Sequence, residues 1–415
     1  MGIRNWLLAL GVGLGVWGAP LQVFAAVDVP GYEGEVETQI EFREDVQSND
    51  SIPFDTYLKI DIRDLKGDTD LYFYGKLWKD FGYGGNWEAD LYQLYVDVPF
   101  TKTARLTVGR QFISEGFETF VSDALKFEQK LESGFRYTFY IGKPRFFEPN
   151  TPDGDDFLAG FKFDYKGFFF GFQHLRNDGR LVKSSLSFGN FSYVGRLFSY
   201  YTRLEVDTAH GELVEANLGL NYFPNRKLRL TANVEYVDPT YTYGDGLYRA
   251  EPIFYLFSPQ GRELRFTQSV HYDVAEGWEL FESYTAVDVQ REGRDNGHLL
   301  RLGVIRDRWF EEGLRWYGAL LYQNSWLGIL RGLELGFTKW LCERFTLRGT
   351  ADIARYDKLI YGKQWANAFY LRGTYQVGDF SNLELGIDWR KNEDFERDTR
   401  LILRYNYLFW GGDKK

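Results

Sequence analysis

The amino-acid sequence predicts an all-β fold: one transmembrane antiparallel up-and-down β-barrel of about 22 strands, within a range of roughly 18 to 24. Three observations support this prediction. Apolar and polar residues alternate along most of the chain, and short connections between the alternating segments take turns with longer ones. Aromatic residues make up 19% of the sequence although its mean hydropathy is only -0.38. Strands that are apolar on one face only would produce all of these features.

The clearest strand pair covers Leu213–Tyr236. On its first arm Val214, Leu218 and Tyr222 alternate with polar residues, and the return arm from Leu228 repeats the pattern. Side chains two residues apart share a face of a strand, so this segment predicts a β-hairpin with one apolar and one wet face. Each arm has about ten residues, which is the length of a tilted strand that crosses a bilayer.

The N-terminal segment, residues 1–25, predicts a secretory signal peptide. Arg4 supplies its positive start, residues 6–16 its apolar core, and residues 23–25 a small-residue cleavage site. No apolar run of about 18 residues follows, so any membrane span in residues 26–415 must be built from strands. We therefore expect a single exported barrel domain over residues 26–415.

Cysteine content and charge exclude several kinds of site. Cys342 is the only cysteine, which rules out an intramolecular disulfide and a cysteine metal cluster. Asp153, Asp155 and Asp156 offer carboxylates to Ca²⁺, but they do not match the EF-hand loop, and a solvated acidic loop is the favoured interpretation. The formal net charge is -10, and a net acidic exported chain is not expected to bind nucleic acid. No metal and no cofactor is predicted.

Connections of two kinds alternate along the chain. Ten are short, such as Lys166–Gly167 and Gly189–Asn190, and eleven are longer and more polar, such as Arg355–Trp365 and Asp238–Gly261. These connections join the predicted 22 strands, about the number and arrangement of a bacterial outer-membrane barrel with short periplasmic turns and longer extracellular loops. Because Asp238–Gly261 is rich in aromatic residues, we expect it to pack as a cap or into the barrel.

Closure requires the last strand to pair with the first. Residues 400–409 and residues 35–42 both alternate between apolar and polar side chains. Unpaired edges in lipid would leave backbone groups without hydrogen bonds, which is very costly. Aromatic residues at strand ends, with Phe100 and Trp278 beside short turns and Trp78 towards a long loop, are typical of girdles at the two membrane interfaces.

The polar positions of the alternation predict a lumenal wall of mixed charge. A barrel of about 22 strands is too wide for side chains alone to fill, so water or folded loops must occupy it. Rings of charge bias ion flow, but both signs are present and no ion preference is predicted. The predicted wall residues are Glu215, Asn217, Arg229, Glu235, Arg348, Asp352, Glu384, Asp388, Arg400 and Arg404.

The segment Leu106–Gln129 contains a Gly-Arg-Gln strand end, residues 109–111, and an Asp-small-Leu strand start, residues 123–125. It resembles segments of porin-like outer-membrane barrels that include the alginate-export family. In such barrels the intervening loop often folds into the lumen and narrows it. The resemblance implies that Arg110, Gln111, Glu115, Glu118 and Asp123 lie at or near a constriction. Strict alternation from Leu106 and Val108 instead points Arg110 towards lipid, unless a bulge lies at Gly109.

The sequence predicts no enzyme. Its four histidines fall near the predicted rims, and neither a Gly-x-Ser-x-Gly elbow nor a His-Glu-x-x-His pair is present. We therefore expect an outer-membrane channel for passive diffusion of small hydrophilic solutes, located in the bacterial cell outer membrane. Two alternatives are a dedicated polysaccharide-export or sugar-uptake channel, and a structural or adhesive barrel closed by its loops. The expected partners are outer-membrane lipid and small hydrophilic solutes or oligosaccharides, with the protein a monomer or a trimer.

Overall fold

The computed structural model describes the barrel wall and most of its short connections. The described residues are 31–44, 50–65, 67–114, 120–145, 156–177, 180–238, 262–290, 296–307, 313–325, 328–360, 363–391 and 398–411. The predicted signal peptide, Glu115, Glu118, Asp153, Asp155 and the aromatic loop after Asp238 lie outside these residues. Among the described residues, no helix is long and apolar enough to span a membrane.

Antiparallel strands account for nearly all of the described chain. Because β2 has two residues and directly precedes β3, the 23 strands make a wall of 23 − 1 = 22, the predicted number. The strands are β1 (Tyr32–Glu44), β2 (Asp50–Ser51), β3 (Pro53–Ile62), β4 (Asp70–Asp80), β5 (Glu88–Thr101), β6 (Ala104–Ile113), β7 (Phe120–Lys130), β8 (Phe135–Arg145), β9 (Phe157–Tyr165), β10 (Phe168–Asn177), β11 (Arg180–Val194), β12 (Phe198–Asp207), β13 (Glu212–Asn225), β14 (Leu228–Val237), β15 (Arg262–Ala275), β16 (Trp278–Gln290), β17 (Gly297–Asp307), β18 (Leu314–Ser325), β19 (Gly328–Cys342), β20 (Phe345–Ile360), β21 (Lys363–Gly378), β22 (Ser381–Lys391) and β23 (Asp398–Gly411).

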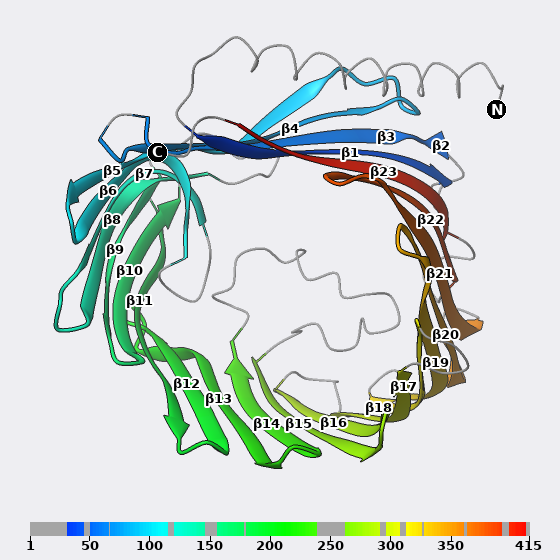
Figure 1. The fold of residues 1–415 in the computed structure, drawn as a ribbon. Coiled ribbons are helices and arrows are strands. Elements are labelled where there is room, and N and C mark those ends of the chain that lie inside the picture. Colours follow the sequence, from blue (N-terminus) through cyan, green and yellow to red (C-terminus); the bar gives the residue numbers. More distant parts are fainter. Residues whose placement is uncertain are drawn as a thin grey trace.

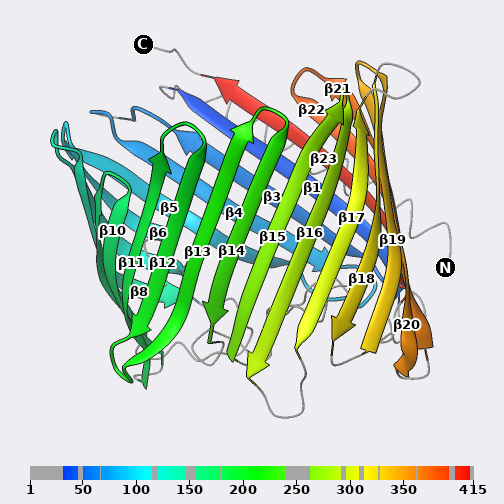
Figure 2. The ribbon, with the colours of Figure 1, turned by 90° about the horizontal axis from the view of Figure 1, so that it is seen from below.

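Each wall strand pairs with the next one in sequence, and the last closes onto the first. Val36 of β1 lies opposite Tyr407 of β23, and Phe42 lies opposite Leu401. Figure 1 looks into the resulting ring, where β1 and β23 run side by side, and Figure 2 shows the strands crossing the wall obliquely. The predicted closed, antiparallel, up-and-down barrel is confirmed.

Apolar side chains cover the outside of this wall. On β22, Leu385 and Ile387 are 53% and 48% exposed, although they are large and apolar. Glu384 and Asp388 have the opposite parity on the same strand and therefore face the lumen. Exposed apolar residues recur on one face of almost every strand, as a wall surrounded by lipid requires.

One predicted turn is wrong. Gly189 and Asn190 lie inside β11, opposite Phe169 and Phe168 of β10. A Cβ at Gly189 would lie 2.0 Å from the Phe169 ring, so this glycine makes room for an aromatic ring across the strand pair. The turn follows at residues 195–197, where Gly195 has a φ of 68°. Glycine and asparagine indicated a turn because both residues favour turns. Here a glycine is required because the Phe169 ring packs against the strand at this position.

The strict alternation of connection lengths also fails in places. β20 continues to Ile360 and β21 begins at Lys363, and these two residues pair across the connection. The predicted long connection Arg355–Trp365 is therefore largely a continuation of the hairpin. Polar residues at these strand ends resemble a loop in sequence because the hairpin extends beyond the apolar part of the wall.

Parts of the lumenal face near the long-loop end are apolar and fully covered. Ile113, Leu158 and Leu175 are 0% exposed and pack in one cluster that also contains Phe120 and Tyr140. A second lumenal cluster includes Leu321, Leu330, Tyr356 and Ala366 on β18 to β21. The water-lined part of the lumen therefore does not extend uniformly over the inner wall.

Candidate functional site

The lumenal wall holds all ten residues predicted for it. On β13, Glu215 and Asn217 have the opposite parity to Leu218, which is 41% exposed on the outside. The same argument from outward-facing neighbours places the other eight on the inner face. These are Arg229, Glu235, Arg348, Asp352, Glu384, Asp388, Arg400 and Arg404.

A network of ion pairs joins three of these residues across the seam where the barrel closes. Arg372 of β21 lies 3.2 Å from Glu384 and 3.0 Å from Asp388, both on β22. Arg404 of β23 lies 3.5 Å from Glu384 and 3.3 Å from Glu37 of β1. Charges from the first and last thirds of the chain therefore alternate around one part of the wall, which stabilises the β1–β23 seam as well as lining the lumen.

A second group of paired charges lies on β11 to β19. Lys183 and Glu205 form a buried ion pair with Nζ 2.6 Å from Oε1. Arg301 of β17 donates to Glu334 of β19 at 2.5 Å, and this carboxylate is nearly buried. The two charges of each ion pair compensate each other, so these pairs contribute little net electric field along the lumen.

Arg348 offers a more exposed charge. It lies on the lumenal face of β20 and its cross-strand neighbours are Thr338 and Arg372. Arg229 is also well exposed, but it pairs with Glu279 of β16. An exposed charge on the wall of a pore biases ion flow.

Aromatic side chains form a feature of the lumenal wall that sequence reasoning missed. Five tyrosines from three strands lie together, and we name them the tyrosine cluster: Tyr57 of β3, Tyr72 and Tyr74 of β4, and Tyr92 and Tyr95 of β5. The rings of Tyr72 and Tyr95 stack with centroids 5.1 Å apart, and Tyr74 lies 5.1 Å from Tyr92 and 6.4 Å from Tyr57. Each ring is half-buried, so part of it meets the lumen.

Two lysines lie over these rings. Lys59 is 5.8 Å from the Tyr72 centroid, and Lys76 is 5.4 Å from that of Tyr57 and 5.5 Å from that of Trp78. Lys76 also pairs with Asp55 at 2.7 Å. Trp78 belongs to this lumenal face, so its predicted place in an outer aromatic girdle is wrong.

The signal for the tyrosine cluster was present in the sequence. Tyr72, Tyr74, Lys76 and Trp78 occupy every second position of β4, with Phe73 and Leu77 between them. Large side chains occupy both the even and the odd positions of β4. The alternation of apolar and polar residues therefore did not show which of the two faces of the strand meets the lumen. At Tyr92 a register shift also adds one residue to β5, which the period of two does not anticipate.

The residues implied by the porin-like resemblance are only partly in the lumen. Arg110 lies opposite Leu94 and Asp123, without a register shift at Gly109, and Leu94 is an exposed outward residue. Arg110 and Asp123 therefore lie on the outer face, and their predicted place at a constriction is wrong. Gln111 faces inwards but is 2% exposed, with its amide donated to the carbonyl oxygen of Ala124 at 3.1 Å.

The outer face holds Arg110 in a local ion pair. Its Nε lies 2.7 Å from Oδ1 of Asp123, and Nε of Arg145 lies 2.8 Å from Oδ2 of the same carboxylate. Gly109 keeps its place in the ladder with a φ of 124°, a conformation that satisfies the strand pairing without a bulge.

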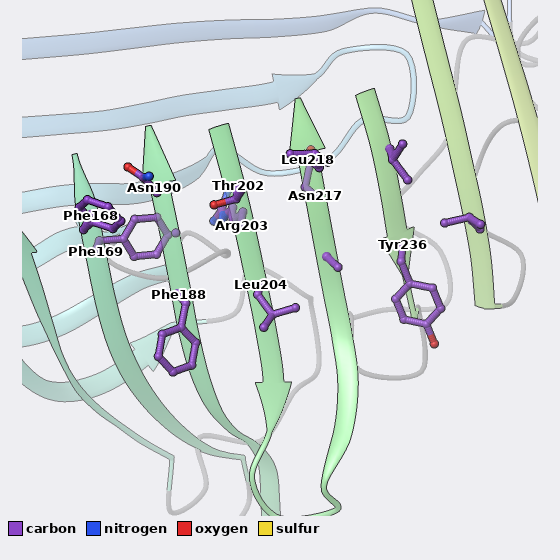
Figure 3. Close-up of a pocket in the computed structure, with 14 residues that line it drawn as sticks. Phe168, Phe169, Phe188, Asn190, Thr202, Arg203, Leu204, Asn217, Leu218 and Tyr236 are labelled. Carbon is purple, nitrogen blue, oxygen red and sulfur yellow. The ribbon is translucent and has the colours of Figure 1, made fainter. Parts of the chain in front are cut away.

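A large concavity of the wall, about 680 Å³, is also on its outer side. Figure 3 shows Phe188, Leu204 and Tyr236 around it, on β11, β12 and β14. Phe188 and Leu204 are exposed apolar residues of the lipid-facing set. The part of the concavity that these residues line therefore lies on the lipid-facing side of the wall.

No candidate catalytic or metal centre is assembled in the part of the chain that the structure describes. No group of three or more His, Cys, Asp or Glu side chains there is placed to hold a metal ion. Three of the four histidines contact a polar group through Nδ1: that of His210 lies 2.5 Å from Asp207, that of His271 lies 2.6 Å from Glu279, and that of His298 lies 2.8 Å from the Tyr284 hydroxyl.

Comparisons with known proteins agree with the fold. No protein-family model and no curated protein sequence matches this chain. The siderophore receptor PirA from Pseudomonas aeruginosa is similar in structure, with a TM-score of 0.59, 11% identity, and coverage of 92% of this chain and 81% of that one. The ferric enterobactin receptor PfeA in complex with BCV-L6 gives 0.56, 10%, 92% and 82%. The outer membrane protein opdK from Pseudomonas aeruginosa gives 0.44, 8%, 92% and 99%. At such identities the likeness is one of fold: this chain shares the closed β-barrel architecture of the two receptors, and no specific family is identified.

Proposed function

We propose that this protein is a channel in the bacterial outer membrane through which small hydrophilic solutes diffuse passively. The observation that carries the proposal is the lumenal wall. It is lined by charged and polar side chains such as Arg229, Arg348 and Asp352, and it belongs to a barrel of 22 strands. A wall of this width and polarity favours an aqueous interior, because barrels of 16 to 18 strands already hold water-filled channels.

The selection mechanism follows from the same wall. Solutes pass according to their size and their interaction with fixed charges, and no covalent chemistry is required. We also propose that the protein is not an enzyme, since its sequence contains neither a Gly-x-Ser-x-Gly elbow nor a His-Glu-x-x-His pair.

Single-channel recording in planar bilayers tests the proposal. The purified full-length mature protein should give stable steps of current that rise linearly with voltage and with salt concentration. Absence of current from protein that remains folded, judged by its shifted mobility on unheated SDS gels, would support the structural or adhesive barrel instead.

A second candidate, a dedicated oligosaccharide channel, is favoured by the tyrosine cluster. Tyr72 and Tyr95 present partly exposed rings and hydroxyl groups to the lumen, and Lys59 lies beside them. Tyrosine has an apolar ring and a polar tip, so a row of such rings can contact both the C–H faces and the hydroxyl groups of a sugar. Block of the open channel by neutral oligosaccharides would favour this candidate over unselective diffusion.

A further inference from the structure

The lipid-facing wall contains one polar group of side chains far from either rim. On β15 and β16 the outward parity is set by Leu264, Tyr272 and Leu280, which are 46%, 43% and 49% exposed. Gln268 and Glu282 have this same parity and therefore point away from the lumen. A carboxylate and an amide among lipid-facing apolar residues need an explanation that channel function does not give.

Gln268 lies near the middle of its strand, and Glu282 lies on the neighbouring strand, four residues from the start of β16. Gln268 lies opposite Tyr284, and Glu282 opposite Val270 on one side and Leu302 on the other. Gln268 is six residues from the start of β15 and seven from its end (262 to 268 and 268 to 275), or about 20 Å along the strand in each direction. Neither water nor lipid headgroups reach the middle of the hydrocarbon region.

Hydrogen bonding within the chain satisfies this group only in part. Nε2 of Gln268 lies 3.4 Å from Oε1 of Glu282. Among the described residues this is the one hydrogen bond that either side chain makes. An amide offers two donors and a carboxylate about four acceptor positions, and acyl chains offer neither donors nor acceptors.

Further hydrogen-bonding side chains lie next to this group on the outer wall. Tyr284 is the next outward-facing residue of β16 after Glu282, and its hydroxyl contacts His298 of β17. We name Gln268, Glu282, Tyr284 and His298 the polar strip. A twofold axis along the membrane normal keeps every residue at its own depth, so the donors and the acceptor of one polar strip would meet those of an identical strip.

The shape of the wall beside the strip also suits a protein surface. A concavity of about 510 Å³ is lined by Gln268, Val270 and Leu230, with the small side chain of Ala232 among them. The concavity of Figure 3 is lined by residues of β10 to β15. Acyl chains fill grooves of this kind as well, so the concavities show only that there is room, and the polar strip identifies the occupant.

We propose that a second copy of this chain packs against the polar strip, so that the protein forms a twofold dimer in the membrane through β15 to β17. In the dimer, the Gln268 amide and Tyr284 hydroxyl of one copy donate to the Glu282 carboxylate of the other. The proposal depends on the membrane-spanning fold and not on channel activity.

Cysteine crosslinking in the native membrane tests the contact. Cys342 is replaced by serine, and single cysteines are introduced by Val270→Cys, beside the polar strip on the outer face of β15, or, as a matched control, by Leu385→Cys, which faces outwards on β22 in another part of the ring (Figure 1). Oxidation should convert most V270C protein into a species of twice the chain mass, at least tenfold more than L385C. Equal yields for the two, or a V270C product of another mass, would overturn the proposal.

Mass measurement in mild detergent provides a second test, which does not depend on whether the cysteine variants fold. The unmodified protein should have the mass of two copies, and one or three copies would contradict the dimer. The double variant Q268L/E282L, which keeps a wholly apolar outer wall, should shift to one copy while still migrating as a folded barrel. If it retains the mass of the unmodified protein, the polar strip is not the contact.

Discussion

The ammonium group of Lys183 lies 2.6 Å from Oε1 of Glu205, and both side chains are 2% exposed. The pair faces the inside of the barrel between β11 and β12, yet water does not reach it. A charge removed from water in this way is stable only while its partner remains. The pair therefore holds β11 and β12 together, and its two charges largely compensate each other.

Replacement of Lys183 by methionine should destabilise the barrel strongly. It leaves the Glu205 carboxylate buried without its cation, a change that costs about 3–5 kcal/mol in other proteins. Urea-induced unfolding of the variant in lipid vesicles measures the effect. The double variant K183M/E205L should recover most of the lost stability, and a double variant as unstable as the single one would contradict this account.

Replacement of Gly109 by alanine should also lower stability, by about 1–3 kcal/mol. Gly109 has a φ of 124°, and a Cβ there would lie 2.3 Å from the carbonyl oxygen of Leu94. The same unfolding measurement applies. Gly85→Ala is the matched control, because nothing lies within 4 Å of its Cβ position, and this variant should be as stable as the parent protein.

Arg348→Glu, which reverses the charge at this position, should make the channel more selective for cations. Arg348 is exposed on the lumenal face of β20. A charge pair at about 4 Å in water is worth about 1 kcal/mol, and reversal exchanges repulsion of cations for attraction, so the ratio of cation to anion permeability should rise by roughly tenfold or more. The reversal potential under a salt gradient reports this ratio, and the shift should shrink at high salt.

The control for Arg348 is Arg306→Glu. The Arg306 guanidinium lies over Trp278, 4.9 Å from its ring centroid, and both residues have the outward parity of Leu280 and Leu302. This substitution changes the charge by the same amount outside the lumen and should leave the reversal potential unchanged. Equal shifts from both variants would mean that Arg348 does not line the ion path.

Loss of two aromatic rings should weaken oligosaccharide block if the tyrosine cluster binds sugars. Tyr72→Ala with Tyr95→Ala removes a stacked pair, and contacts of this kind are worth about 0.5–1.5 kcal/mol, so the dissociation constant should rise up to about tenfold. Current fluctuations at several sugar concentrations give that constant. Tyr272→Ala, on the outer face, should not change it.

The tests of sugar block and of channel function have separate outcomes. A variant that conducts normally but is no longer blocked supports the tyrosine cluster as the binding site. Normal conductance without any sugar block in the parent protein would remove the oligosaccharide candidate and leave passive diffusion unaffected.

Several parts of the fold follow from the order of residues along the chain. Residues 213–236 form the predicted hairpin, with Leu218 outside and Glu215 inside, because a strand turns successive side chains to opposite faces. The same rule predicted the inner position of Arg404, and the cost of bare strand edges in lipid predicted the pairing of β1 with β23. These results depend only on strand geometry and on the contrast between lipid and water.

Other features depended on which strands become neighbours. Gly189 looked like a turn in sequence, but the ring of Phe169 packs against it across the strand pair. Tyr57, Tyr74 and Tyr92 come from three strands and meet only because the register brings them together. A local motif likewise implied a lumenal Arg110, and the uninterrupted ladder at Gly109 turned it outwards.

The sequence by itself thus determined a closed barrel and the inner or outer face of most side chains, because a period of two is a local property of the chain. Only the tertiary structure decided which side chains contact each other around the ring, such as Lys183 with Glu205 and Gln268 with Glu282. Contacts between strands depend on register and on small shifts such as the one at Tyr74, and no single strand contains that information.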